Sequence, residues 1–63
     1  MNGHGLYVFA YYDDENKMQT EYISAGTFKY ATEQFYQIAQ IKNIKTPIVK
    51  RVTVYERKEV INL

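Results

Sequence analysis

The chain has 63 residues, no cysteine, one histidine and a formal net charge of +1 at neutral pH. The missing thiols exclude a disulfide, the lone His4 argues against a structural zinc site, and the small net charge gives no electrostatic case for a nucleic-acid partner. We expect residues 1–63 to form one small domain. A chain of this length buries only about 60% of the surface exposed on unfolding, so a partner chain would add needed stability.

The first predicted strand covers residues 5–12, GLYVFAYY, which are rich in β-branched and aromatic types. Both of its sides are apolar, because successive side chains of a strand point to opposite faces. One side is aliphatic and the other is aromatic: Leu6, Val8 and Ala10 form the first, and Tyr7, Phe9 and Tyr11 form the second.

The polar residues 13–17 predict a hairpin turn to a second strand. Over these few residues the sequence resembles the DDATKT hairpin loop in the immunoglobulin-binding domain of streptococcal protein G. Such a loop implies a four-residue connection that pairs Asp13 with Met18. Phe9 then lies opposite Tyr22, and cross-strand aromatic pairs stabilise this register by roughly 0.2–1 kcal/mol each. A three-residue connection is the second alternative, and it would change which side chains share a face.

A helix is predicted to follow, with Thr27 as its N-cap after Gly26. Five residues at helical spacing form one apolar stripe: Phe28, Ala31, Phe35, Ile38 and Ala39. The helix should end near Asn43, which tolerates the left-handed conformation, and Ile44 should fold back as its hydrophobic contact. Pro47 supports the same end point.

Residues 48–61 alternate as one long third strand. The alternation assigns side chains to two sides, with Ile48, Lys50, Val52, Val54 and Glu56 on one and Arg51, Thr53, Tyr55 and Arg57 on the other. We therefore predict an α+β domain with two layers and the element order β-β-α-β. Its sheet is three-stranded and antiparallel, with strand order 2-1-3, and one helix packs on one face.

The aliphatic side of the sheet is expected to face the helix, because the helix stripe already contributes two Phe rings. Tyr also prefers positions in which its ring is covered and its hydroxyl stays in water. This assignment leaves an uncovered aromatic face. Its predicted binding residues are Tyr7, Phe9, Tyr11, Tyr22 and Tyr55, with Arg51 and Arg57 at the rim.

An uncovered aromatic face normally marks an interaction site, and Tyr, Phe and Arg are enriched in protein interfaces. We expect a small non-enzymatic protein-interaction module, most simply a homodimer joined through this face. Abundant Tyr, Ile, Lys and Asn, which have AT-rich codons, are compatible with a phage or mobile-element accessory protein that binds a host protein. The plain alternative is that the tyrosines face solvent as good strand formers.

A single-stranded nucleic-acid-binding protein is the alternative function. Tyr7, Phe9 and Tyr55 would stack bases, and four basic residues would contact phosphate: Lys50, Arg51, Arg57 and Lys58. The net charge is low for this class of protein.

An enzyme is not expected, since one Ser, one His and no Cys give no evident set of nucleophile, base and orienting group. The acidic residues Asp13, Asp14 and Glu15 have oxygen ligands for a hard cation, but such clusters are more often solvated turns. We expect no metal and no cofactor. No apolar run approaches the ~20 residues that span a bilayer, and no signal peptide is evident, so a cytoplasmic protein without membrane contact is expected.

Overall fold

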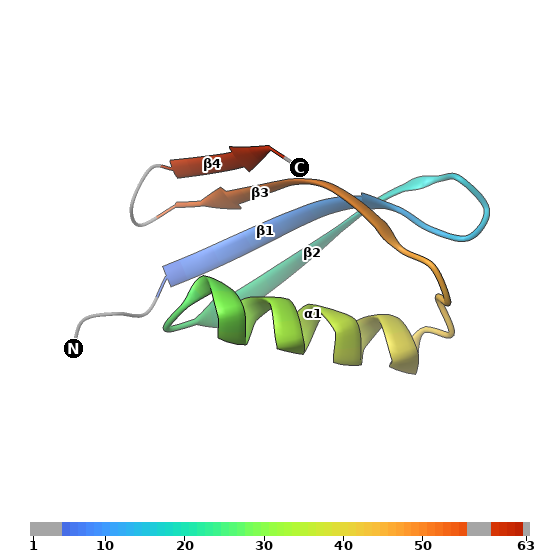
Figure 1. Ribbon diagram of the computed structural model, residues 1–63, viewed down its shortest axis with the longest axis horizontal. Coiled ribbons are helices and arrows are strands. Elements are labelled where there is room, and N and C mark those ends of the chain that lie inside the picture. Colours follow the sequence, from blue (N-terminus) through green and yellow to red (C-terminus); the bar gives the residue numbers. More distant parts are fainter. Residues whose placement is uncertain (1–4, 56–58, 63) are drawn as a thin grey trace.

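A computed structural model describes residues 5–55 and 59–62 of the chain (Figure 1). These residues form an α+β domain in which one helix packs on one face of an antiparallel sheet with strand order β2-β1-β3-β4. The strands are β1 (Gly5–Tyr12), β2 (Met18–Ala25), β3 (Ile48–Val54) and β4 (Glu59–Asn62), and the helix is α1 (Phe28–Ile41). The α+β class is as predicted. No helix in the described ranges is long and apolar enough to cross a membrane.

The sheet has a fourth strand, so the prediction of three strands is wrong in this detail. The last segment forms two strands, because the chain turns after β3 and β4 pairs back onto it. Val52 lies opposite Ile61, and Thr53 lies opposite Val60. The return gives residues 59–62 backbone partners that a single long strand, running past the end of β1, would leave unpaired. Arg57 and Lys58 lie outside the described residues.

The turn between β1 and β2 is a three-residue connection, where a four-residue loop was predicted. Asp13 N–H donates to Lys17 O, and Asn16 N–H donates to Asp13 O, each at 2.9 Å. Asn16 has a φ of 64°, in the left-handed region that Asn tolerates better than most residues. A β-turn followed by one left-handed residue is the usual build of a three-residue hairpin loop. The Asp13 carboxylate supports it by accepting the N–H groups of Glu15 and Lys17.

This loop moves the register of β2 by one residue from the predicted one. Tyr12 pairs with Met18, and Phe9 pairs with Glu21 rather than with Tyr22. A shift of one residue exchanges the faces of one strand relative to its neighbour. The aromatic side of β1 therefore lies with Ile23 of β2, and the aliphatic side of β1 lies with Tyr22.

The aromatic side of β1 faces the helix, so the assignment of the aliphatic side to this position is wrong. Tyr7, Phe9 and Tyr11 are 1% exposed or less. The Phe9 ring stacks on Phe28 and Phe35, with centroid distances of 6.4 and 4.8 Å and interplanar angles of 5° and 7°. Such pairs stabilise a core by about 0.5–1.5 kcal/mol beyond the area they bury. Large rings also bury more area than Leu6, Val8 or Ala10 could, which suits a small core. The expected helix-facing residues of the other strands, Ile23, Val52 and Val54, are buried as predicted.

Both ends of α1 are built as predicted. The Thr27 hydroxyl oxygen accepts a backbone N–H of the first turn at 3.1 Å. At the other end Asn43 has a φ of 63°, its N–H donates to Gln40 O at 3.0 Å, and Ile44 N–H donates to Ala39 O at 2.8 Å. These two bonds make a Schellman motif, and Ile44 packs against the core as its hydrophobic contact.

A bulge in β3 interrupts the predicted alternation of that strand. The partners of successive β1 residues jump from Arg51 to Val49 and leave Lys50 without a pairing position. One extra residue reverses the side-chain directions before the bulge. Val49 therefore packs against the core, whereas Ile48, which was expected to share a side with Val52, is exposed.

Candidate interaction surface

The face of the sheet opposite α1 has no other element packed on it within the described residues. We call it the open face. Its apolar side chains come from every strand: Leu6, Val8, Ala10 and Tyr12 of β1, Met18 and Tyr22 of β2, Ile48 of β3, and Val60 of β4. Tyr55 extends this surface, since its N–H donates to Leu6 O at 3.0 Å and continues the ladder by one residue beyond β3.

The apolar surface of the open face is large for so small a domain. Five of its side chains are between 52% and 66% exposed: Met18, Tyr22, Ile48, Tyr55 and Val60. The β1 side chains between them are half-buried. Val8 lies at the centre, with Tyr22 opposite it on one side and Thr53 on the other. Contiguous exposed apolar surface of this kind is typical of a site that contacts another molecule.

Three of the predicted binding residues reach the open face, and three do not. Tyr22, Tyr55 and Arg51 are exposed on it. The predicted Tyr7, Phe9 and Tyr11 are instead buried against α1, because the three-residue loop turns this side of β1 toward the helix. Arg57 is outside the described residues.

The prediction also missed side chains that do lie on the open face. They are Leu6, Val8, Ala10, Tyr12, Ile48 and Val60. The signal that identifies most of them is Asn16, whose position suits the left-handed residue of a three-residue hairpin loop.

A polar cluster joins the hairpin to the end of the helix on the other side of the sheet. The Tyr11 hydroxyl donates to Glu21 Oε2 at 2.8 Å, and Lys42 Nζ donates to the same oxygen. Burial, together with the bond to the Glu21 carboxylate, raises the pKa of Tyr11 well above its usual range. The cluster connects β1, β2 and the C-cap of α1, and each of its groups is engaged by another, which indicates a structural role.

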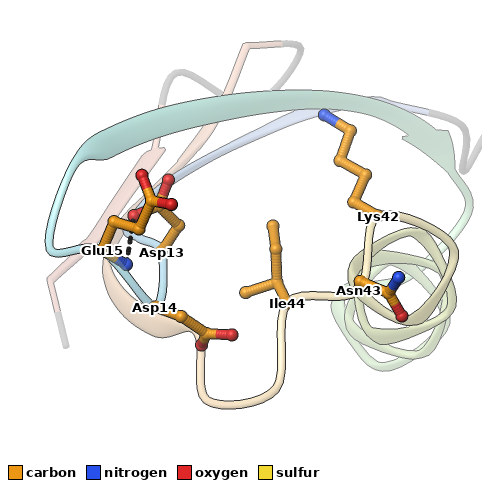
Figure 2. Close-up of a pocket in the computed structure, with 6 residues that line it drawn as sticks. All are labelled: Asp13, Asp14, Glu15, Lys42, Asn43 and Ile44. Carbon is orange, nitrogen blue, oxygen red and sulfur yellow. Dashed lines mark hydrogen bonds between the residues drawn. The ribbon is translucent and has the colours of Figure 1, made fainter.

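A small cavity of about 220 Å³ lies between the hairpin loop and the end of α1. Figure 2 shows the loop carboxylates on one side and the helix end on the other, with lining residues Asp13, Asp14, Glu15, Lys42, Asn43 and Ile44. In the described part of the chain, no group of three or more His, Cys, Asp or Glu side chains is placed to hold a metal ion.

The aspartates beside this cavity are occupied by hydrogen bonds within the protein. Asp14 accepts the N–H groups of Lys45 and Thr46 at 2.8 Å each, and also the Thr46 hydroxyl at 3.0 Å. These bonds hold the pKa of Asp14 below its usual value, and the Lys17 N–H and the Gln19 amide do the same for the pKa of Asp13. Asp14 thus fastens the loop between α1 and β3 to the hairpin, and the cavity is not the best candidate site.

Comparisons with protein-family models, with curated proteins and with solved structures found no match for this chain. Function is therefore inferred from the geometry of the chain itself, and the open face is the strongest candidate surface.

Proposed function

We propose that this chain is a small non-enzymatic protein-interaction module that binds through the open face, most simply to a second copy of itself. One observation supports this function above the others: apolar side chains cover the open face across every strand of the sheet, and five large ones are more than half exposed. Covering them would remove apolar area from water, a gross gain of about 25 cal/mol per Å² that offsets the freedom lost on association.

The chemistry of the open face suits a protein partner. Tyr and Met are enriched in the centres of protein interfaces, whereas charged residues are depleted there. Among the paired residues of the described chain, Arg51 is the charged side chain on this face, and the polar ones are neutral: Thr20, Ser24, Thr53 and Asn62. The exposed Lys50 lies in the bulge and has no pairing position. A self-contact would also add burial to a domain whose own core is small.

A host protein bound by a phage or mobile-element accessory protein would contact the same face. A second copy is the simpler partner because the same patch on two copies meets itself about a two-fold axis, and two-fold dimers are the commonest oligomers.

Single-stranded nucleic acid is the weaker alternative, because its stacking platform is largely lost. Tyr7 and Phe9 are buried against α1, so Tyr55 alone of the three proposed stacking residues is exposed. Tyr22 and Arg51 still share the open face with it. If this alternative holds, an oligonucleotide at low salt should shift the Tyr22 and Tyr55 resonances, and the affinity should fall steeply with added salt.

The test of the open-face homodimer is Val8→Lys, at the centre of the face. A lysine there adds a charge that a self-contact would have to desolvate, while in a free domain its long stem can lie along the sheet and keep the ammonium in water. Light scattering after size-exclusion chromatography should give at least twice the 7.5 kDa chain mass for the wild type and a smaller multiple for Val8→Lys.

Gln37→Lys is the matched control, because Gln37 is exposed on α1, away from the open face. It adds the same charge and should leave the mass unchanged. A wild-type protein that runs as one chain at the highest soluble concentration would contradict the homodimer. An unchanged mass of Val8→Lys would contradict the use of this face for self-association.

A further inference from the structure

The outer edge of β2 carries backbone groups without partners in the described residues. β2 has eight residues and, within the ranges 5–55 and 59–62, pairs only with β1. Paired residues of an antiparallel ladder alternate between bonding each other and pointing away. The Asp13–Lys17 backbone bond fixes this alternation, so the odd-numbered residues of β2 bond to β1. Thr20, Tyr22 and Ser24 therefore point their N–H and C=O groups outward.

The free edge of β2 lacks most of the devices that usually protect an edge strand. Such devices include Lys or Pro on the strand, a bulge, a very short strand, or a charged side chain that points inward. β2 has no Lys or Pro, and its pairing with β1 is regular over its whole length. Its one charged residue, Glu21, does point inward, but this charge is paired with Lys42, and the carboxylate also accepts the Tyr11 hydroxyl. The opposite edge strand, β4, has only four residues.

A second copy of β2 fits this edge in one register better than in the others. A two-fold pairing centred on Glu21 would set two carboxylates opposite each other, and such like-charge pairs are destabilising. A pairing centred on Thr20 would use only the first part of the strand. A pairing centred on Tyr22 sets Glu21 opposite Ile23 and Thr20 opposite Ser24, and it overlaps residues 19–25.

We infer that β2 pairs antiparallel with β2 of a second copy, with Tyr22 opposite Tyr22, so that two sheets join into one. The outward backbone groups of Thr20, Tyr22 and Ser24 then bond those of the other copy. The side chains of these three residues lie on the open face. The joined sheet therefore has one continuous open face made from both copies. This edge contact is distinct from the open-face contact proposed above, and with both contacts the assembly contains four chains.

The edge contact is tested by Thr20→Pro, with Thr20→Ala as its matched control. Proline removes the outward N–H of residue 20 without removing a bond to β1, and proline is tolerated on edge strands for this reason. Alanine keeps the N–H and should keep the wild-type mass. We expect light scattering to give four chains for the wild type, two for Thr20→Pro, two for Val8→Lys and one for the double variant.

Failure of the edge contact differs from failure of the open-face contact. Two chains in the wild type and in Thr20→Pro, with one chain in Val8→Lys, would overturn the edge contact and leave the open-face homodimer. Two chains in the wild type and in Val8→Lys, with one chain in Thr20→Pro, would overturn the open-face homodimer and leave the edge contact. A wild-type protein of one chain would overturn both.

Amide hydrogen exchange in the unmodified protein provides a test that does not depend on the folding of a variant. If the edges pair, the N–H groups of Tyr22 and Ser24 should be protected to a degree similar to the inward N–H of Ile23. Exchange of Tyr22 and Ser24 at the rate of an unprotected chain, beside a protected Ile23, would overturn the edge contact.

Discussion

Tyr7 and Tyr11 are both fully buried on the same side of β1, yet only one of their hydroxyls is satisfied. The Tyr11 hydroxyl donates to Glu21 Oε2 at 2.8 Å, whereas the Tyr7 hydroxyl has no hydrogen-bond partner among the described residues. A buried polar group without a partner costs about 1–3 kcal/mol, and a bond to a charged acceptor contributes a similar amount. The two tyrosines therefore form a natural matched pair.

Removing the two hydroxyls should have different effects on the free energy of unfolding. Tyr11→Phe removes a bond to a carboxylate and should destabilise the protein by about 1–2 kcal/mol. Tyr7→Phe removes an unsatisfied group and should leave the stability unchanged or raise it by up to about 1 kcal/mol. Urea unfolding of both variants measures the difference. Equal losses in the two variants would show that the Glu21 bond does not stabilise the fold.

The Tyr11 environment also predicts how stability changes in alkali. The folded protein holds the Tyr11 proton more tightly than the unfolded chain does, because burial and Glu21 raise the pKa above its ordinary value of 10.0. The stability that the protonated Tyr11 hydroxyl contributes is complete below the ordinary pKa and is lost as the pH rises toward the folded pKa. Wild-type stability should therefore fall more steeply than that of Tyr11→Phe as the pH rises above about 10. Parallel urea midpoints over that range would count against it.

The Asp14 bonds predict a dependence of the opposite sign in acid. Hydrogen bonds from Lys45 and Thr46 lower the pKa of Asp14 in the folded protein below its ordinary value of 3.8. The stability that the ionised carboxylate contributes is therefore present above the ordinary pKa and is lost as the pH falls through the folded pKa. Asp14→Asn should lower the melting temperature at neutral pH and make its decline below about pH 4 shallower.

Glu15→Gln is the control for Asp14→Asn. Glu15 is an exposed carboxylate of the same loop whose side chain makes one ion pair, with Lys17 at 3.7 Å. Exposed pairs of this kind contribute little, so the melting temperature of Glu15→Gln should match that of the wild type. Thermal unfolding followed by circular dichroism measures both variants, and equal melting temperatures for the two would contradict a stabilising role of Asp14.

The left-handed residue after α1 predicts a clear order of stability at position 43. Asn43→Gly removes the steric cost of a positive φ and should match or exceed the wild type. Asn43→Ala keeps a Cβ in that conformation and should be less stable than Asn43→Gly by about 1 kcal/mol. Chemical unfolding of the two variants tests this order, and an Ala variant as stable as the Gly variant would show that the turn adopts another conformation.

The parts of the fold that depend on local chemistry could be predicted from the sequence. The N-cap at Thr27, the stop at Asn43 and the contact of Ile44 each depend on residues within one turn of the helix end. The helix-facing side of β2 was also correct, since Ile23 is buried, and so was that of the part of β3 after the bulge, where Val52 and Val54 are buried.

The orientation of the central strand could not be predicted in the same way. β1 is apolar on both sides, so its hydrophobic pattern does not distinguish the two faces. Its orientation depends on a choice between two loop lengths that differ by one residue, and the sequence of residues 13–17 accommodates both. This explains why Tyr22, Tyr55 and Arg51 were correctly placed on the open face while Phe9 was not. The fourth strand was missed because residues 48–61 alternate with no obvious break.

The stacked rings of the core make the protein its own spectroscopic probe. The chain has no tryptophan, but the Phe9 ring lies nearly parallel to both Phe28 and Phe35. Ring currents from these neighbours will move the Phe9 ring protons away from their unfolded-state shifts, and the difference will vanish on unfolding. Core packing can thus be followed through Phe9 while Tyr22 and Tyr55 report separately on what binds the opposite face.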